Sequence, residues 1–335
     1  MIRRKITYAV LFTSPFILIF LSLFIGRYPI SFGRIVEILW SRLFGGPGIE
    51  MDVLTTIVWD IRLPRALLGA LVGSSLAVSG AAFQGLFRNP LVSSGMLGVS
   101  SGAGFGAALA ILIFSQSFYI YPFAFFFGLS AVILSYLIGT IYKTTPSIML
   151  VLSGVIVSQI FSSLISLVKF AADPQDQLPT IVFWLMGSLA SSRYKDVAFA
   201  VIPIGIGISG LFLLRWRINV LSMGDKEAKT LGINTRVTKS LIILFATLST
   251  VGAVCVSGIV GWVGLVIPHI GRMVAGNDNR TLIPVSISLG ASFMIIVDLL
   301  ARNLTGSEIP LGILTSLIGA PFFVYLLKKT KGKGW

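Results

Sequence analysis

The sequence predicts an all-α polytopic membrane protein, organised as a single transmembrane domain over residues 1–335. Three observations support this prediction. Of the residues, 55% are hydrophobic, only 11% are charged, and uncharged runs of membrane length recur along the chain. A soluble domain carries about 25% charged residues, so a large soluble helical core is a poor alternative.

About ten membrane-spanning helices are expected, because about 20 apolar residues cross a bilayer and charged residues delimit each run. The first run, Ile6–Gly26, is too long for a signal peptide, so it predicts a retained helix. The run 89–142 is long enough for two helices with a turn near Gln116–Tyr121, and the run 240–271 for two with a break around Ser257–Gly261. The five remaining predicted spans are Ala66–Phe87, Thr144–Val168, Val197–Leu214, Thr281–Val297 and Ile309–Leu327.

Two further segments are expected to be helical without crossing the membrane. Gln177–Ser192 is too short to cross and contains Pro179, which indicates a half-helix at one face. Ser31–Leu43 is amphipathic, with Ile35, Ile38 and Leu39 opposed to Arg34, Glu37 and Arg42. This pattern is typical of a helix lying in the membrane interface.

The basic residues predict the orientation of the chain. A net charge of +14 on a soluble protein would suggest nucleic acid, but here the cations lie between apolar runs, which indicates membrane topology and lipid headgroups instead. Ten spans place both termini on one side, with 17 of the 26 lysines and arginines on that side and 9 on the other. The positive-inside rule therefore predicts cytoplasmic N- and C-termini. Because membrane topology explains the excess of cations, no nucleic-acid partner is expected.

The longest loop on the predicted cytoplasmic side is 215–239, and it contains a short charged segment from Gly224 to Gly232. This segment predicts a short helix that Gly232 ends in the left-handed conformation. From the residues alone, a solvated connector and a docking element are equally well supported. Elsewhere, Gln84 and Asn89 are polar groups expected at membrane depth, where such groups face a bundle interior or an aqueous path.

Several motifs together resemble a known family. They include Gly261–Arg280 with the only histidine, His269, after Pro268; Gln84 with Asn89-Pro90-Leu91; Phe183–Leu189; and Glu308–Thr315. From about Trp59 to Leu327 the chain closely resembles the FecCD family, the permease subunits of type II ABC importers for iron-siderophores, haem and vitamin B12. The resemblance implies a fold similar to the vitamin B12 permease, with a short outer half-helix and a cytoplasmic coupling helix.

The resemblance also implies roles for particular residues. Gly224, Ala228, Leu231 and Gly232 would belong to the loop that couples the permease to its ATPase. Cytoplasmic gates would be formed by Asn89 and Leu91, and by Thr144, Thr145 and Ser147. Arg62, Arg65 and Arg302 would dock the substrate-binding protein, while Gln84, Pro268 and His269 would belong to the pathway or its supporting structure.

The implied assembly is an ATP-driven importer in a prokaryotic cytoplasmic (inner) membrane. Two copies of the chain would form the pathway, with two cytoplasmic ABC ATPase subunits and a periplasmic or lipid-anchored substrate-binding protein as partners. An iron chelate (siderophore) is the first expected cargo, with vitamin B12, haem or molybdate/tungstate as alternatives. Which of these the chain carries stays open at this point.

The sequence contains no P-loop and no cluster of residues with metal-ligand spacing. We therefore expect no enzyme activity, no metal and no cofactor in this chain, with ATP and Mg²⁺ bound by the partner ATPase. For His269 a structural hydrogen bond is expected rather than proton relay. An ion- or proton-coupled secondary transporter would bury more ionisable residues, and a membrane enzyme would need a catalytic constellation; both remain as lower-ranked alternatives.

Overall fold

The computed structural model describes residues 2–45, 52–114, 117–141 and 147–330. Within these ranges the secondary structure consists of helices without any strand. The helices are α1 (Ile2–Phe24), α2 (Phe32–Phe44), α3 (Val53–Thr55), the π-helical segment η1 (Thr56–Arg62), α4 (Leu63–Phe87), α5 (Val99–Phe114), α6 (Ser117–Gly139), α7 (Ser147–Ala171), α8 (Gln177–Met186), α9 (Tyr194–Leu221), α10 (Asp225–Thr230), α11 (Thr235–Ser257), α12 (Val263–Ala275), α13 (Asn279–Asn303) and α14 (Leu311–Thr330).

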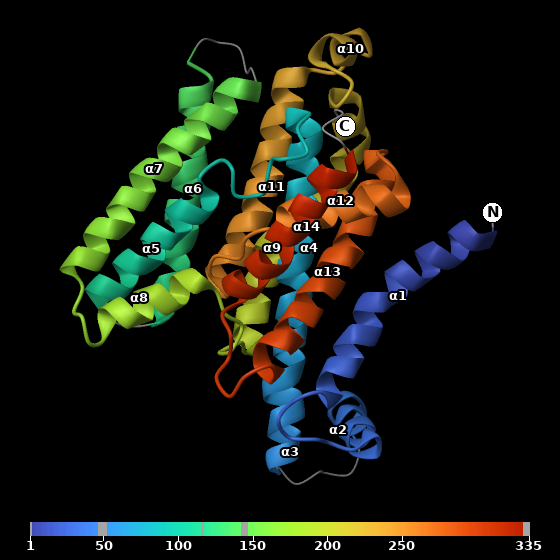
Figure 1. The fold of residues 1–335 in the computed structure, drawn as a ribbon, viewed down its shortest axis with the longest axis vertical. Helices are drawn as coiled ribbons and strands as arrows, with labels where there is room; N and C mark the ends of the chain where they lie inside the picture. Colours follow the sequence, from blue (N-terminus) through green and yellow to red (C-terminus); the bar gives the residue numbers. More distant parts are fainter. Residues whose placement is uncertain (1, 46–51, 115–116, 142–146, 331–335) are drawn as a thin grey trace.

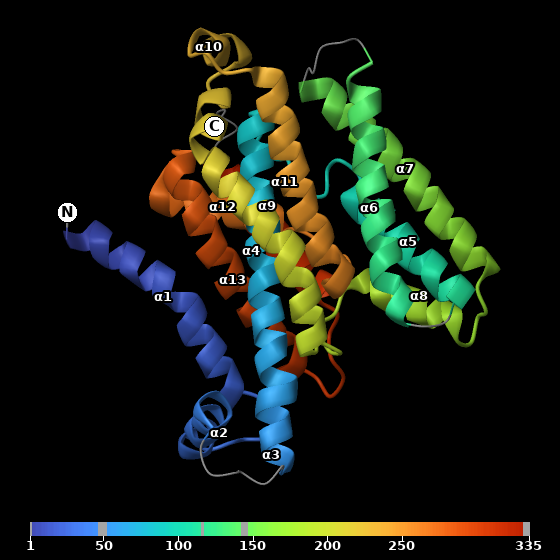
Figure 2. The same ribbon diagram turned by 180° about the vertical axis from the view of Figure 1, so that it is seen from behind.

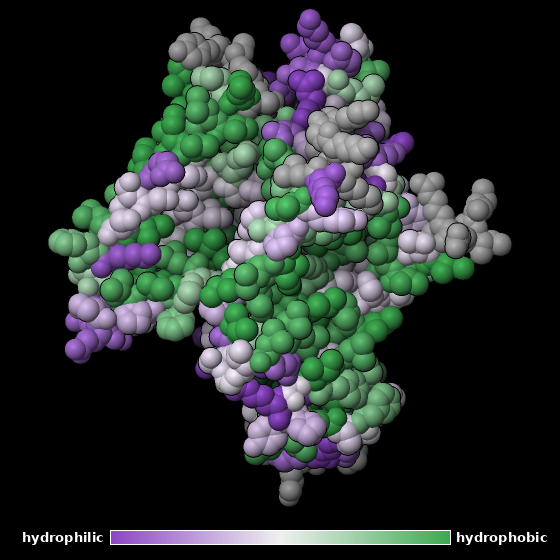
Figure 3. Space-filling view, viewed as in Figure 1, coloured by the Kyte–Doolittle hydropathy of each residue, from purple (hydrophilic) through white to green (hydrophobic). Residues whose placement is uncertain are grey.

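Helix α4 runs through the centre of the molecule, with α9, α11, α12 and α13 packed around it (Figures 1 and 2). Helices α5 to α8 form a second group beside this bundle, and α14 lies across its front in Figure 1. Helix α10 projects at one end of the bundle and α2 lies at the opposite end; we call these the α10 end and the α2 end. Figure 3 shows hydrophilic side chains gathered chiefly toward these two ends, with hydrophobic surface between them.

The all-helical, multi-span prediction is confirmed, and every predicted span is occupied by a helix. Seven helices in the described residues are long and apolar enough to cross a membrane, the longest being Val53–Phe87. The other three predicted spans coincide with shorter apolar helices, Val99–Phe114, Val263–Ala275 and Leu311–Tyr325. The predicted break around Ser257–Gly261 separates α11 from α12, and both α1 and α14 have their terminal ends toward the α10 end.

Three predicted boundaries were wrong. The second span begins at Val53 rather than Ala66, because Arg62 and Arg65 are buried inside the protein instead of marking a membrane surface. Residues 89–98, expected within a span, form turns before α5 begins at Val99. The segment 117–121, expected as a turn, is already the first part of α6, where Tyr119 stacks on Phe114 at a centroid distance of 4.3 Å.

Small residues allow α4 to approach its neighbours at backbone distance. A Cβ atom on Gly73 would overlap the carbonyl oxygen of Gly290 in α13, and one on Gly80 would overlap that of Gly264 in α12. Membrane helices associate through such small-residue contacts because lipid provides no hydrophobic driving force between them. The glycines of α4 therefore fix its central position.

The two predicted non-spanning helices are also present. In α2, Ile35 and Ile38 are fully buried against Leu23 and Val58, as the amphipathic pattern predicted. Helix α8 ends at Met186, earlier than the predicted Ser192, because it is followed by Gly187, whose φ of 75° is in the left-handed region. The carbonyl of Gly187 then accepts a hydrogen bond from the N–H of Leu311 at 2.9 Å, which ties α8 to the start of α14.

Candidate coupling, gating and pathway site

The predicted charged helix in the long loop is α10, and Gly232 ends it in the left-handed conformation as expected. Gly224 precedes it with φ 144°, and Gly232 follows with φ 75°. The N–H of Ile233 donates to the carbonyl of Ala228 at 3.0 Å, which closes the helix end in the manner of a Schellman cap. The helix is thus terminated locally, independently of any partner.

The side chains of α10 divide into an anchored face and a free face. Ala228 is fully buried in the main core, while Leu231 is 57% exposed at the tip of the loop. Lys239 at the base of α11 forms an ion pair with Asp225 at 2.7 Å. Anchored in this way, α10 presents an exposed apolar residue on a rigid support, which is an arrangement suited to docking against a second protein.

The expected gate residues Asn89 and Leu91 form a tight turn at the α10 end of α4. The N–H of Leu91 donates to the side-chain oxygen of Asn89 at 2.9 Å, and Leu91 is 47% exposed. The preceding residue, Arg88, ends α4 in the left-handed conformation with φ 52°. Its guanidinium lies 3.6 Å from the position that a Cβ on Gly224 would occupy, so this turn and α10 are neighbours.

The other gate residues are only partly observable. Thr144 and Thr145 lie outside the described residues. Ser147 is the first residue of α7. The gate role of these three residues stays a prediction.

Gln84 links three segments inside the bundle. Its amide nitrogen donates to the carbonyl of Val92 at 3.1 Å and to that of Gly264 at 3.4 Å. Its side-chain oxygen accepts a hydrogen bond of 2.6 Å from the guanidinium of Arg272 in α12. The expectation that Gln84 faces a bundle interior and has polar partners is therefore confirmed.

Pro268 and His269 lie in the same short helix, α12, and both are buried. The ring of His269 packs edge-to-face against Phe322 of α14, with centroids 6.4 Å apart. The Pro268-His269 pair thus lies where α12 meets α14.

The three arginines expected to dock a partner are turned into the protein at the α2 end. Arg62 donates to the carbonyls of Leu23 and Tyr28 at 2.5 and 2.6 Å. Arg302 donates to the carbonyl of Ser22 at 2.8 Å. These donors hold the end of α1 inside the chain, and the docking role of the three arginines stays a prediction.

Among the three arginines, Arg65 has the lowest exposed fraction and forms ion pairs with two carboxylates. It is 4% exposed and bridges two carboxylates, Asp298 and Glu308, with N–O distances of 2.8 Å to each. Arg302, one helical turn after Asp298, is farther from the same carboxylate, at 4.0 Å. The partners of Arg65 were missed because they lie 233 and 243 residues away in the chain.

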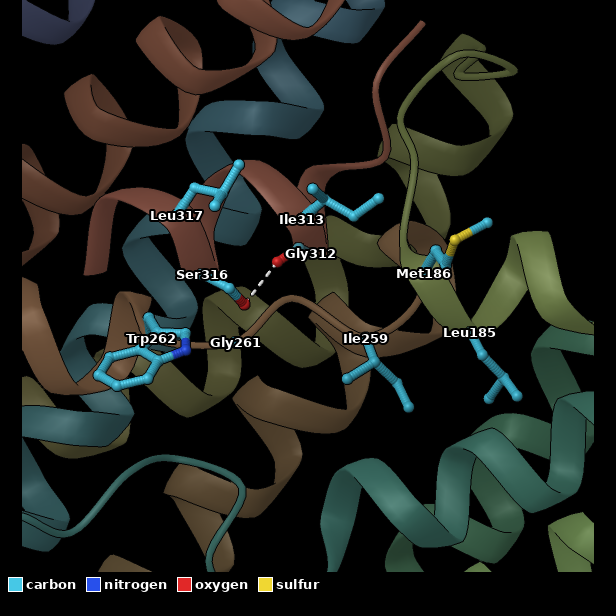
Figure 4. Close-up of a pocket in the computed structure, with 9 residues that line it drawn as sticks. All are labelled: Leu185, Met186, Ile259, Gly261, Trp262, Gly312, Ile313, Ser316 and Leu317. Atoms are coloured by element: carbon cyan, nitrogen blue, oxygen red, sulfur yellow. Dashed lines mark hydrogen bonds between the residues drawn. The ribbon is translucent and has the colours of Figure 1, made fainter. Parts of the chain in front are cut away.

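A cavity of about 560 Å³ lies between the end of α8, the α11–α12 break and the start of α14 (Figure 4). Its lining is mainly apolar, with Ser316 donating to the carbonyl of Gly312 as one of its polar features. Trp262 forms one wall in a left-handed conformation (φ 66°), packed against Gly319. The sequence predicted a half-helix at the outer face but did not identify Trp262 or the residues of α14 as lining.

Comparisons with known proteins identify the family. The pattern of the FecCD transport family matches residues 15–329. The molybdate import system permease protein of Haemophilus influenzae is 41% identical over 94% of this chain and 93% of its own length. A protein of Helicobacter pylori named as a probable iron chelatin transport system permease is 43% identical over 84% of this chain and 86% of its own length.

A solved structure agrees with this assignment. An inward-facing conformation of a metal-chelate type ABC transporter superimposes with a TM-score of 0.85 at 39% identity, covering 97% of this chain and 99% of the other. The predicted family and permease fold are therefore confirmed, and with them a multi-pass protein of the inner membrane that acts as a transport subunit. The chain belongs to the FecCD transport family of ABC importer permeases.

Proposed function

We propose that two copies of this chain form the pathway of an ATP-driven importer for a metal complex, with the α10 end in the cytoplasm. The observation that supports this most directly is α10 itself. Its anchored Ala228 and exposed Leu231 give a rigid apolar projection, as a coupling element between a permease and an ATPase requires.

Coupling in this proposal passes from α10 to the gate. An ATPase docked on Leu231 would move α10, and Arg88, which lies beside Gly224, would transmit that motion to the Asn89–Leu91 turn. Gln84 would then relay it to α12, since it bonds both Val92 after the turn and Arg272. ATP binding and hydrolysis in the partner would in this way shift the dimer between outward- and inward-facing states. The chain itself would need no cofactor.

The cargo we propose first is an iron chelate, and the second candidate is molybdate. The relative with 43% identity is named for iron chelatin, and the one with 41% identity over a larger share of the chain is named for molybdate. The mainly apolar lining of the 560 Å³ cavity supports a path of low intrinsic specificity, with selection by a substrate-binding protein at the α2 end. Vitamin B12 and haem remain further alternatives.

The test is the ATPase activity of this chain reconstituted with its ATPase and with binding proteins loaded with ferric siderophore, molybdate, cobalamin or haem. Stimulation by one loaded binding protein supports the importer and names the cargo. If the molybdate-loaded binding protein stimulates the ATPase activity and the siderophore-loaded one does not, molybdate replaces the iron chelate as the proposed cargo. Failure of any ATPase to assemble with the chain would overturn the importer and favour a secondary transporter.

A further inference from the structure

A buried ionic cluster joins α4, α13 and the segment before α14 at the α2 end. The Nε of Arg65 donates to both carboxylate oxygens of Asp298 at 2.9 and 3.0 Å. Its two terminal nitrogens donate to the two oxygens of Glu308 at 2.8 and 2.9 Å. One guanidinium therefore holds two carboxylates at once, in the bidentate geometry in which such pairs are strongest.

The two halves of the cluster differ in exposure. The side chains of Arg65 and Asp298 are each 5% exposed, whereas that of Glu308 is 34% exposed. Separating Arg65 from Asp298 would leave a buried charge unpaired, which is strongly unfavourable. Separating Arg65 from Glu308 leaves the arginine neutralised by Asp298 and lets water solvate the released carboxylate. The Glu308 half is therefore the one that can open.

Glu308 belongs to the segment 304–310, which leads directly into α14. Other ties to this segment are hydrogen bonds to backbone carbonyls: the guanidinium of Arg27 donates to the carbonyls of Thr305 and Gly306, and the N–H of Ile309 donates to that of Ala301 at 3.1 Å. The first turns of α14 supply Gly312, Ile313, Ser316 and Leu317 to the wall of the cavity in Figure 4. Segment 304–310 therefore positions that wall together with the hydrogen bond from the N–H of Leu311 to the carbonyl of Gly187.

We propose that Arg65 and Glu308 are positioning residues that latch the start of α14, with Asp298 holding Arg65 in place, and that opening of the Arg65–Glu308 pair moves the cavity wall. The proposal goes beyond the transport function and relies on it only for the view that this cavity belongs to the pathway. It also accounts for three arginines at the α2 end facing inward, since their donors hold elements of this chain together.

The test measures access to the cavity in the isolated permease in lipid nanodiscs. Ser316→Cys is introduced together with Cys255→Ala, which removes the buried native cysteine, and the rate of labelling by a small water-soluble maleimide is followed. Glu308→Gln should raise that rate about fivefold, because a partly exposed ion pair shifts an equilibrium by roughly this factor. Glu37→Gln, which breaks the exposed Arg34–Glu37 pair at the same end, should leave it unchanged.

A salt series provides a second readout that a purely structural role would not move. Raising ionic strength should speed labelling with Glu308 present, because the partly exposed Glu308 carboxylate is open to counter-ions, and should have little effect on Glu308→Gln. The effect of salt on the labelling rate can be measured in the protein that retains Glu308 even if the Glu308→Gln variant folds poorly. Equal labelling rates for both forms, or the same salt response in both, would overturn the latch. An ATPase that fails to assemble would refute the importer but leave this result standing.

Discussion

Replacing Gln84 is the sharpest test of how the gate turn is joined to the bundle. Gln84→Leu keeps nearly the same volume but removes both the donor to Val92 and the acceptor of Arg272. Gln84→Glu keeps the acceptor, adds a charge opposite to that of Arg272 and loses only the donor. Comparing the two variants therefore separates the contribution of the hydrogen bond from Arg272 from that of the hydrogen bond to Val92.

The expected magnitude follows from the two lost contacts. A hydrogen bond to a charged group contributes about 1.5–3 kcal/mol, and an unsatisfied buried carbonyl costs about 1–3 kcal/mol. Arg272 is only partly buried, so water recovers part of the first loss and the low ends of both ranges apply. We expect Gln84→Leu to lower the free energy of unfolding by about 2–3 kcal/mol, and Gln84→Glu by less than about 1 kcal/mol.

The assay is reversible unfolding in mixed micelles of increasing SDS fraction, followed by tryptophan fluorescence. An ordinary interhelical hydrogen bond in a membrane contributes about 0.6 kcal/mol on average. A loss for Gln84→Leu no larger than this, or an equal loss for both variants, would refute the argument that Gln84 supports a cation inside the bundle.

Three further predictions follow from the described contacts. Leu231→Asp should weaken ATPase binding at least about tenfold without changing the thermal midpoint, because the side chain is exposed; unchanged affinity in a pull-down titration would remove Leu231 from the docking surface. Asp298→Asn should cost about 1.5–3 kcal/mol in the same SDS assay, since buried Arg65 loses its charged contact with Asp298 and keeps the one with Glu308, whereas Glu37→Gln should cost less than about 0.5 kcal/mol. Gly80→Val should destabilise the protein by about 3 kcal/mol or more through overlap with Gly264, and a near-neutral effect would show that α4 and α12 can separate.

The elements that sequence reasoning placed correctly are those encoded by neighbouring residues. The break before α12 follows from Ser257–Gly261, and the end of α10 follows from Gly232, because glycine takes the left-handed conformation at low cost. Each of these signals lies within a few residues of the feature that it determines. Local chemistry was therefore sufficient for them.

The features that were missed depend on contacts between distant parts of the chain. Arg62 and Arg65 looked like the end of a span, yet they lie within a continuous helix. Arg62 donates to a carbonyl of α1, and Arg65 pairs with Asp298 in α13 and with Glu308 before α14. A charge normally marks the membrane surface, and that rule fails when a partner more than 200 residues away neutralises it inside the protein.

The central place of α4 has a consequence for how the protein is made. Nearly all the helices packed against α4, including α9, α11, α12 and α13, follow it in the chain. During synthesis α4 therefore enters the membrane long before its partners exist. In that interval its serines, which later bond the carbonyls of α11 and α13, face lipid or transient neighbours. Assembly of the core must wait for α13, so truncation before that helix should leave inserted but unpacked spans that quality-control proteases remove.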